Sequence, residues 1–291
     1  FQELGHEVTF LIGTFTGLIG DPSDKDEARP QQTHAQVMEH ARTYADQVFR
    51  ILDRSRTQVR YNGDWLARLT FADVIELASF FTVQQFLARE RFARRYAEGK
   101  PIWVHEFMYG LMQGYDAVEM QTDVQVGGSE QLFNLLAGRK LQEARGQRPQ
   151  IAITMPILVG TDGHERMSKS TGNTVNIDDP PNEMYGKVMS IPDSALLNFY
   201  TLVTRYGPQQ IAAVERGLAD GTLHPMEAKK ELACEIVSIL HGDEAAARAE
   251  AHFERVFQDG RLPANIPVHV LDGPANVVAL LVEAGLAPSK S

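Results

Sequence analysis

A short segment in the second half of the chain combines small, flexible and cationic side chains. Residues 164–173 read H-E-R-M-S-K-S-T-G-N, with Arg166 and Lys169 as the cations. In phosphoryl and nucleotidyl transfer a protein mainly positions the nucleotide and stabilises charge that develops on phosphate oxygens, a task that suits Lys and Arg. A solvated turn is the alternative, but the pattern is too particular for it. The segment predicts a mobile phosphate-binding loop.

Two further segments carry glycines next to polar side chains. Residues 16–23 read T-G-L-I-G-D-P-S, in which the glycines allow a tight turn close to a ligand and Asp21 would face a cation such as an α-ammonium group. The alternative is an ordinary Asp-Pro turn. Lys25 follows on the same loop, where it could meet phosphates or simply be solvated.

The third segment, 125–131, reads Q-V-G-G-S-E-Q and runs from a predicted strand end to a predicted helix start. Its backbone and polar tips could hold a ribose, although it has neither the G-x-G-x-x-G spacing nor the G-K-[ST] of a P-loop. The alternative is that Ser129 caps the helix and Glu130 lies in its first turn.

One predicted helix presents three polar side chains on a single face. Tyr109, Gln113 and Asp116 are spaced i, i+4, i+7, so they lie above one another and could line a pocket. Such a face is more often core or solvated surface. However, a buried carboxylate without a partner costs several kcal/mol, so an Asp among apolar neighbours favours the pocket.

Strands and helices alternate in the first part of the chain, which predicts a Rossmann-like, doubly wound, mostly parallel sheet in an α/β domain. Ligands bind such sheets beyond the carboxyl ends of their strands, where the glycine segments fall. The first strand is a continuous apolar run, as expected in the middle of a sheet. The predicted strands are 8–12, 57–61, 123–126 and 151–155; the predicted helices are 33–52, 71–79, 83–98, 106–118 and 130–143.

Helices alone follow from about Pro180. The expected ranges are 194–204, 208–218, 225–240 and 244–257. We therefore divide the chain into a catalytic domain (1–180), a helical domain (181–262), and a linker with the start of a further module (263–291).

Composition restricts the class of protein. The net charge of −10 argues against a protein that coats DNA or RNA non-specifically. Cys234 is the only cysteine, which excludes an internal disulfide or a CxxC metal site and is compatible with a reducing cytoplasm. No apolar run reaches the roughly 20 residues of a membrane-spanning helix. We expect a soluble, cytoplasmic protein.

R-M-S-K-S resembles the K-M-S-K-S signature of class I aminoacyl-tRNA synthetases. Taken with T-G-L-I-G-D-P-S, Y-N-G-D-W (61–65), Y-G-L-M-Q-G-Y-D (109–116) and Q-V-G-G-S-E-Q, it makes nearly the whole chain similar to bacterial tyrosyl-tRNA synthetases. The resemblance implies activation of tyrosine with ATP to tyrosyl-adenylate, with Mg²⁺, and transfer to tRNA(Tyr). It also implies a homodimer, for which 102–107 is a plausible interface segment.

The resemblance assigns roles to individual residues. Glu130 stands where most relatives have aspartate, and Arg166 where lysine is commoner. The implied tyrosine-binding residues are Asp21, Asn62, Tyr109, Gln113, Asp116, Gln125 and Gln131. The implied ATP-binding residues are Gly127, Gly128, Glu130, Met167, Ser168 and Lys169, and the implied catalytic residues are Lys169, Arg166 and Lys25.

Two rival functions remain. A tryptophanyl enzyme would be expected to lack the set on the helix face, which argues against it. A non-catalytic, synthetase-derived RNA-binding protein gains weight because the H-x-G-H segment of class I enzymes is absent. Since both ends look like fragment ends, we expect truncation of the parent enzyme and an inactive fragment. The basic clusters 89–95 and 229–230 are candidate tRNA contacts.

Overall fold

The computed structural model describes residues 1–22, 33–168 and 171–258, together with 276 and 280. The predictions made for Lys25, for Lys169 and for nearly all of 263–291 lie outside the described residues.

The strands form two parallel pairs. β1 (Val8–Ile12) pairs with β2 (Thr57–Tyr61), and β3 (Val124–Gly128) pairs with β4 (Ile151–Met155), each pair in register from its first residue. Parallel strands joined through helices confirm the α/β class. Within the described residues the two pairs share no ladder, so β1 is paired along one edge only and Thr9 is exposed. This differs from the mid-sheet position expected from its apolar run.

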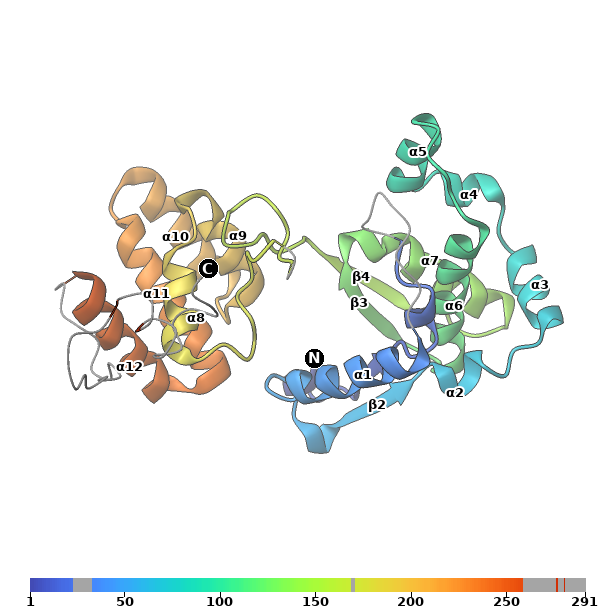
Figure 1. Ribbon diagram of the computed structural model, residues 1–291, viewed down its shortest axis with the longest axis horizontal. Coiled ribbons are helices and arrows are strands. Elements are labelled where there is room, and N and C mark those ends of the chain that lie inside the picture. The colour runs from blue at the N-terminus through green and yellow to red at the C-terminus, as the bar shows by residue number, and fades with distance from the viewer. Residues whose placement is uncertain (23–32, 169–170, 259–275, 277–279, 281–291) are drawn as a thin grey trace.

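Seven helices of the described residues belong with these strands (Figure 1). The predicted helix 83–98 is interrupted: Arg89 has an extended backbone, and its guanidinium lies over the rings of Phe92 and Phe133, at 5.0 and 4.7 Å from their centroids. The helices are α1 (His34–Val48), α2 (Gly63–Leu66), α3 (Phe71–Ser79), α4 (Val83–Leu87), α5 (Glu90–Ala97), α6 (Val104–Glu119) and α7 (Leu132–Ala144).

Helix α6 is the centre of this part of the molecule. Met112, Leu111 and Val118 each join a different apolar cluster, so α6 packs against α2, against α3 and α7, and against α4 and α5. A side chain at Gly114 would lie 3.1 Å from the backbone of Ala137 in α7, which explains the glycine there. The position of α6 is therefore fixed from several sides.

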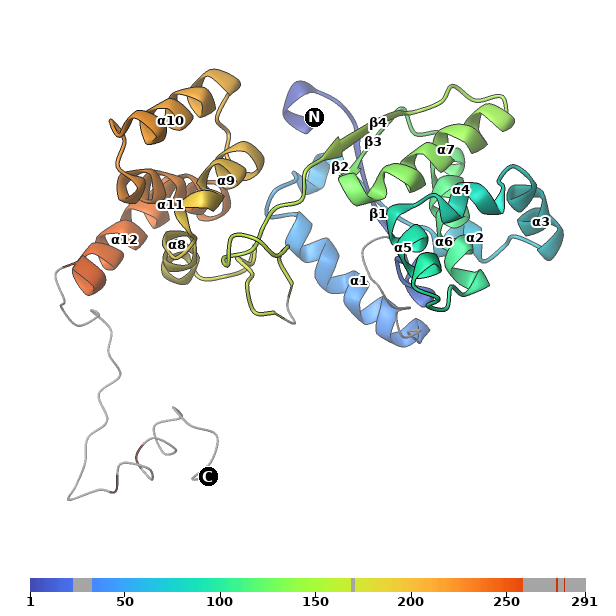
Figure 2. The same ribbon diagram turned by 90° about the horizontal axis from the view of Figure 1, so that it is seen from above.

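The second part of the chain is helical, as predicted, and has its own apolar core (Figures 1 and 2). Tyr185, Phe199 and Leu232 are almost fully buried in it. Its helices are α8 (Pro181–Met189), α9 (Leu196–Val203), α10 (Pro208–Asp220), α11 (Pro225–His241) and α12 (Asp243–Phe253), followed by a π-helical turn (Glu254–Gln258).

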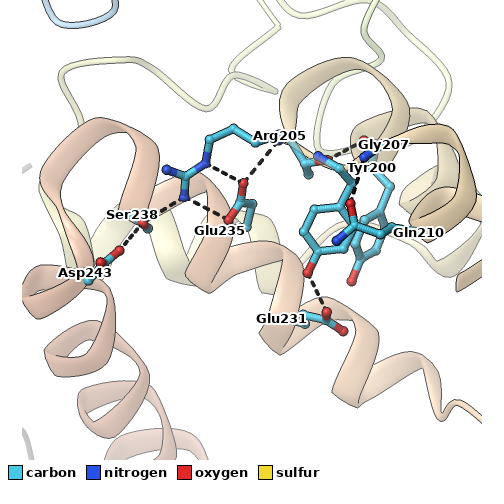
Figure 3. Close-up of polar contacts among 10 residues, drawn as sticks. Tyr200, Arg205, Gly207, Gln210, Glu231, Glu235, Ser238 and Asp243 are labelled. Carbon is cyan, nitrogen blue, oxygen red and sulfur yellow. Dashed lines mark hydrogen bonds and ion pairs between the residues drawn. The ribbon is translucent and has the colours of Figure 1, made fainter.

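Polar contacts fasten the turn between α9 and α10 to α11 (Figure 3). The Arg205 guanidinium donates to both carboxylate oxygens of Glu235, at 2.9 and 3.0 Å, and to Ser238 Oγ at 3.1 Å. Tyr200 Oη donates to the Ala228 carbonyl at 2.8 Å. Across the described ranges, no helix combines the length and apolar character required to cross a membrane.

A buried ion pair joins α5 to the start of α6. Arg95 donates to both carboxylate oxygens of Glu106 at 2.7 and 2.9 Å, and both side chains are 2% exposed. Glu106 also accepts from the Trp103 backbone N–H at 2.7 Å, which satisfies a donor at the helix start. Each side chain therefore neutralises the buried charge of the other.

We expect Arg95→Met to lower the free energy of unfolding by about 3–5 kcal/mol, because it leaves Glu106 buried and unpaired. Arg95→Met combined with Glu106→Leu should recover most of the loss. Urea denaturation measures both, with Arg54→Met as the control, since the Arg54–Asp46 pair is 69% and 80% exposed and is worth at most about 1 kcal/mol. Equal losses for Arg95→Met and Arg54→Met would contradict the interpretation.

Candidate active site

The carboxylate of Asp116 lies inside the protein near the end of α6. It is 2% exposed. The indole Nε1 of Trp65 donates to Oδ1 at 2.8 Å, and Asn62 Nδ2 donates to Oδ2 at 3.1 Å. Both oxygens thus have one donor each, and further lone pairs remain for a third donor.

The two donors come from the carboxyl end of β2 and from α2, which follows it. Asn62 is 1% exposed; its Nδ2 also donates to Thr16 Oγ1 at 3.0 Å, and its Oδ1 accepts from the Phe15 N–H at 2.8 Å. Thr16 and Phe15 follow β1. The carboxyl ends of neighbouring parallel strands therefore meet at Asp116, which is where open α/β sheets bind ligands.

Burial changes the acid strength of this group. Desolvation raises the pKa of Asp116 to about 7, and the hydrogen bonds from Asn62 and Trp65 oppose the rise because they stabilise the carboxylate. The group therefore titrates near neutral pH. A ligand that donates a hydrogen bond to it would favour the charged form.

Tyr109 and Gln113 lie on the same face of α6 as Asp116, as their spacing predicts. Gln113 Oε1 is buried and has no hydrogen-bond partner among the described residues. A buried acceptor without a donor is costly, so it suits a ligand donor such as an ammonium group.

A second polar chain links the first glycine segment to the segment after β3. Gln131 Nε2 donates to Asp21 Oδ2 at 2.6 Å, and Asn134 Nδ2 donates to Gln131 Oε1 at 3.0 Å. Asp21 and Gln131 are 110 residues apart in sequence. The structure thus brings together two side chains that the resemblance assigned to tyrosine binding.

Gly127 and Gly128 end β3 and lead into a 3₁₀ turn, Ser129–Gln131. A side chain at Gly128 would collide with Glu130 Oε2, so the glycine is what allows the Glu130 carboxylate to fold back over the backbone. That Oε2 atom is buried without a hydrogen-bond partner in the described part of the chain. It is suited to accept from a hydroxyl group of a ligand.

Gln125 makes an internal contact that the sequence did not indicate. Its Oε1 accepts from Gln150 Nε2 at 2.7 Å, and Gln150, fully buried, also donates to the Leu135 carbonyl at 3.1 Å. This leaves the Gln125 amide nitrogen as the group that could reach a ligand.

The segment 156–168 follows β4 and contacts the helical part. Met167 packs against the apolar core of that part, together with Leu158 and Val159. A side chain at Gly163, whose φ is +80°, would collide with Pro192. The loop carrying Arg166 to Ser168 is therefore held against the helical part.

A cavity of about 590 Å³ lies between this loop and α4–α5. Its lining includes Arg166, Ser129, Glu130, Arg89 and Phe133. Burial lowers the pKa of Arg89, an effect that the nearby Asp21 carboxylate opposes. Three arginines (Arg89, Arg91 and Arg166) and two glutamates line this cavity, and cations beside an acidic acceptor suit a nucleotide.

Three cations of the two candidate tRNA-contact clusters form internal ion pairs. Arg95 is buried against Glu106. Lys229 Nζ lies 2.7 Å from Asp193, and Lys230 Nζ lies 2.8 Å from Glu254. These pairs disfavour the hypothesis of tRNA contact at 229–230, because their charges are already matched.

Sequence reasoning missed several residues of the site. Trp65 was part of the Y-N-G-D-W segment, but nothing in its spacing indicates that the indole N–H reaches Asp116. Thr16 and Gln150 were likewise outside the predicted set, and each orients a residue within it.

The chain is similar to known proteins along its length. Residues 1–258 match the family model described as tRNA synthetases class I (W and Y). The tyrosine–tRNA ligases of Thermotoga maritima and Moorella thermoacetica are each 51% identical over all of this chain, which spans 73% and 71% of those proteins.

A solved structure is similar in fold. The tyrosyl-tRNA synthetase of Archaeoglobus fulgidus, complexed with L-tyrosine, superposes with a TM-score of 0.64 at 23% identity, over 86% of this chain and 82% of that one. The family match over residues 1–258 and the 51% identity to bacterial relatives show that the chain belongs to the class I tRNA synthetases of the W and Y family.

Proposed function

We propose that this chain is a tyrosine–tRNA ligase, which activates tyrosine with ATP to tyrosyl-adenylate and transfers it to tRNA(Tyr). The observation that carries the proposal is the buried Asp116 carboxylate, held by Trp65 and Asn62, on the same helix face as the unsatisfied Gln113 acceptor. The full-length similarity to tyrosine–tRNA ligases supports it.

The tyrosine-binding roles follow from the chemistry of this face. Asp116 would accept from the phenol hydroxyl, while Tyr109, Gln113 and Asp21 would take the ammonium group. Asn62 would hold Asp116 in place. Gln125 and Gln131 would contact the carboxylate side of the tyrosine substrate. Phenylalanine would leave Asp116 without its third donor, a penalty that tyrosyl-tRNA synthetases are known to exploit.

ATP would occupy the cavity at the signature loop. Glu130 would accept from the ribose and Arg166 would bear on the phosphates, since both line the cavity. ATP-binding roles for Gly127 and Gly128 rest on the resemblance, because the Glu130 carboxylate lies against Gly128 and neither glycine lines the cavity. Met167 and Ser168 would orient that part of the loop. Roles for Lys169 and Lys25 at the phosphates rest on the resemblance alone, because both lie outside the described residues.

The reaction needs no covalent enzyme intermediate. A tyrosine carboxylate oxygen attacks the α-phosphorus of ATP, and pyrophosphate leaves; the terminal ribose hydroxyl of tRNA then attacks the tyrosyl carbonyl, and AMP leaves. Acceleration would come from positioning and charge stabilisation. Mg²⁺, which the resemblance implies, would be bound through the ATP phosphates.

We further propose that residues 1–180 form the catalytic domain and 181–262 a helical domain on the anticodon side of the tRNA, with an RNA-binding module beginning within 263–291. The separate apolar core of the helical part supports the boundary between the first two of these domains. A cytoplasmic location fits substrates that are used in protein synthesis.

Tyrosine-dependent exchange of pyrophosphate into ATP tests the proposed function, with the protein expressed from its complete gene. We expect exchange that requires tyrosine and is not supported by tryptophan or phenylalanine at equal concentration. Absence of exchange together with binding of tRNA would instead favour the non-catalytic RNA-binding protein, and exchange with tryptophan would move the chain to the other branch of the family.

The pKa of Asp116 predicts a pH dependence of tyrosine use. Because this pKa is about 7, the carboxylate is protonated below that pH and loses strength as an acceptor for the phenol hydroxyl. The KM for tyrosine should be lowest above about pH 7.5 and should rise by up to about tenfold per pH unit below pH 7, while the KM for ATP stays nearly constant.

The inhibition constant of phenylalanine is the control, since phenylalanine has no hydroxyl to donate. It should change little between about pH 8 and pH 6. If the KM for tyrosine changes as little with pH as the inhibition constant of phenylalanine does, Asp116 is not the acceptor for the hydroxyl.

We also propose that the chain forms a homodimer through the segment 102–107. Trp103 and Val104 are 55% and 73% exposed at the start of α6, and Tyr96 at the end of α5 is 69% exposed. Neighbouring exposed apolar side chains of this size are typical of protein interfaces.

Val104→Asp should weaken the dimer by about tenfold or more, because it buries a charge at the interface. Sedimentation velocity over a range of concentrations measures the dissociation constant. Ile51→Asp is the matched control, since Ile51 is 58% exposed in the segment between α1 and β2, outside the proposed interface segment. A monomeric wild-type protein at micromolar concentration, or equal effects of the two variants, would contradict the proposal.

A further inference from the structure

The loop that carries Arg166 is built as two consecutive turns. An antiparallel bridge joins Val159 to Arg166, and the Gly160 N–H donates to the Glu165 carbonyl at 2.6 Å. Beyond it, the N–H groups of Thr171 and Gly172 donate to the Ser168 carbonyl at 3.2 and 3.1 Å. The two turns share no further ladder within the described residues, so another contact must set their relative position.

Asn173 makes that contact. It is 5% exposed, and its Oδ1 accepts from the Ser168 N–H at 2.8 Å and from Thr171 Oγ1 at 2.7 Å. Its Nδ2 donates to the Arg166 carbonyl at 3.2 Å and to Asp162 Oδ2. One amide therefore joins both turns, and its orientation is fixed because a carboxylate can only accept.

Asp162 completes the arrangement from the first turn. Its Oδ1 accepts from the N–H groups of His164 and Glu165 at 2.9 and 2.8 Å. The His164 N–H, followed by the Asn173 amide, lowers the pKa of Asp162 to about 2, so it is a carboxylate at neutral pH. We name the Asp162–Asn173 contact, with the backbone groups it holds, the loop clamp.

The surroundings leave the clamp little freedom. A side chain at Gly160 would collide with Asn173 Nδ2, and the Thr161 N–H donates to the Asn173 carbonyl at 2.9 Å. Met167, between the two clamped positions Arg166 and Ser168, packs into the helical core. The backbone at 166–168 is thus held on both sides.

We propose that Asp162 and Asn173 are positioning residues that set the path of the signature loop, and so the placement of Arg166 against the ATP phosphates. This rests on the proposed function for its kinetic consequence. Neither residue touches the tyrosine-binding face of α6, so the clamp acts on ATP use and not on tyrosine binding. It confines the loop to one arrangement, which positioning of a nucleotide requires.

Exchanging the two side chains tests the contact directly. Asn173→Asp places two carboxylates together and should disrupt the clamp. Combining Asn173→Asp with Asp162→Asn restores one amide and one carboxylate. The carboxylate at position 173 would still accept from Ser168 and Thr171, and the amide oxygen at position 162 would still accept from the N–H groups of His164 and Glu165. At the Arg166 carbonyl the exchange replaces a hydrogen bond with a contact between two acceptor oxygens, so recovery should be incomplete.

Pyrophosphate exchange with the protein from its complete gene is the kinetic readout. Asn173→Asp should lower kcat/KM for ATP by about 100-fold with the KM for tyrosine changed less than about twofold, and the exchanged pair should recover to within about tenfold of wild type. Asp220→Asn is the matched control, because Asp220 accepts from the Thr222 N–H in a similar turn of the helical part; it should leave both parameters unchanged.

An exchanged pair no better than Asn173→Asp, or a parallel rise in the tyrosine KM, would overturn the proposal. Amide hydrogen exchange of residues 160–168 judges the clamp without any activity. It should accelerate in Asn173→Asp and return towards wild type in the exchanged pair. If wild type shows no pyrophosphate exchange but this protection pattern holds, the proposed function fails and the clamp stands; if the protection pattern is missing, the clamp fails.

Discussion

The buried carboxylate of Asp116 is the constraint on which the α/β part of this protein depends. An ionised group at this depth is tolerated only with donors on both oxygens, and those donors come from Trp65 and Asn62. Because Asn62 also holds Thr16 and the Phe15 N–H, a single carboxylate ties the ends of β1 and β2 to α6.

That arrangement costs stability. A carboxyl whose pKa is raised by folding opposes folding as pH rises from its unfolded value of 3.8 towards about 7, and the full penalty persists above pH 7. An apolar residue would avoid the penalty. Retaining a carboxylate here is consistent with use of the charge by a ligand, and strain or cost of this kind is common at functional sites.

Helix α6 also has a buried acidic group at its start, where Glu106 is neutralised by Arg95. A cation beside Asp116 would have lowered its pKa, whereas desolvation, which the two neutral donors only partly oppose, raises it to about 7.

Local patterns predicted most elements of the fold. An apolar run indicated the first strand, and all four predicted strands agree with the structure to within two residues. The predicted helix start at 33 is where Thr33 caps α1, through a capping box with Gln36. The break between α4 and α5 could not be predicted, since no Gly or Pro marks it; tertiary contacts of Arg89 with two aromatic rings accompany it.

In the candidate site, too, local patterns predicted some residues, and contacts distant in sequence determine the others. Spacing on one helix placed Tyr109, Gln113 and Asp116 together, because helical periodicity is local. The bond between Asp21 and Gln131, 110 residues apart, and the role of Trp65 depend on which side chains folding brings opposite each other.

The central claim is that Asp116 binds the side chain of tyrosine and has no part in binding ATP. Isothermal titration of Asp116→Ala with each ligand tests it, with Asp123→Ala as the control, since Asp123 is exposed just beyond α6. Loss of a hydrogen bond to a charged group predicts tyrosine affinity about 10- to 100-fold weaker with ATP affinity nearly unchanged. Equal losses for the two ligands would contradict the account.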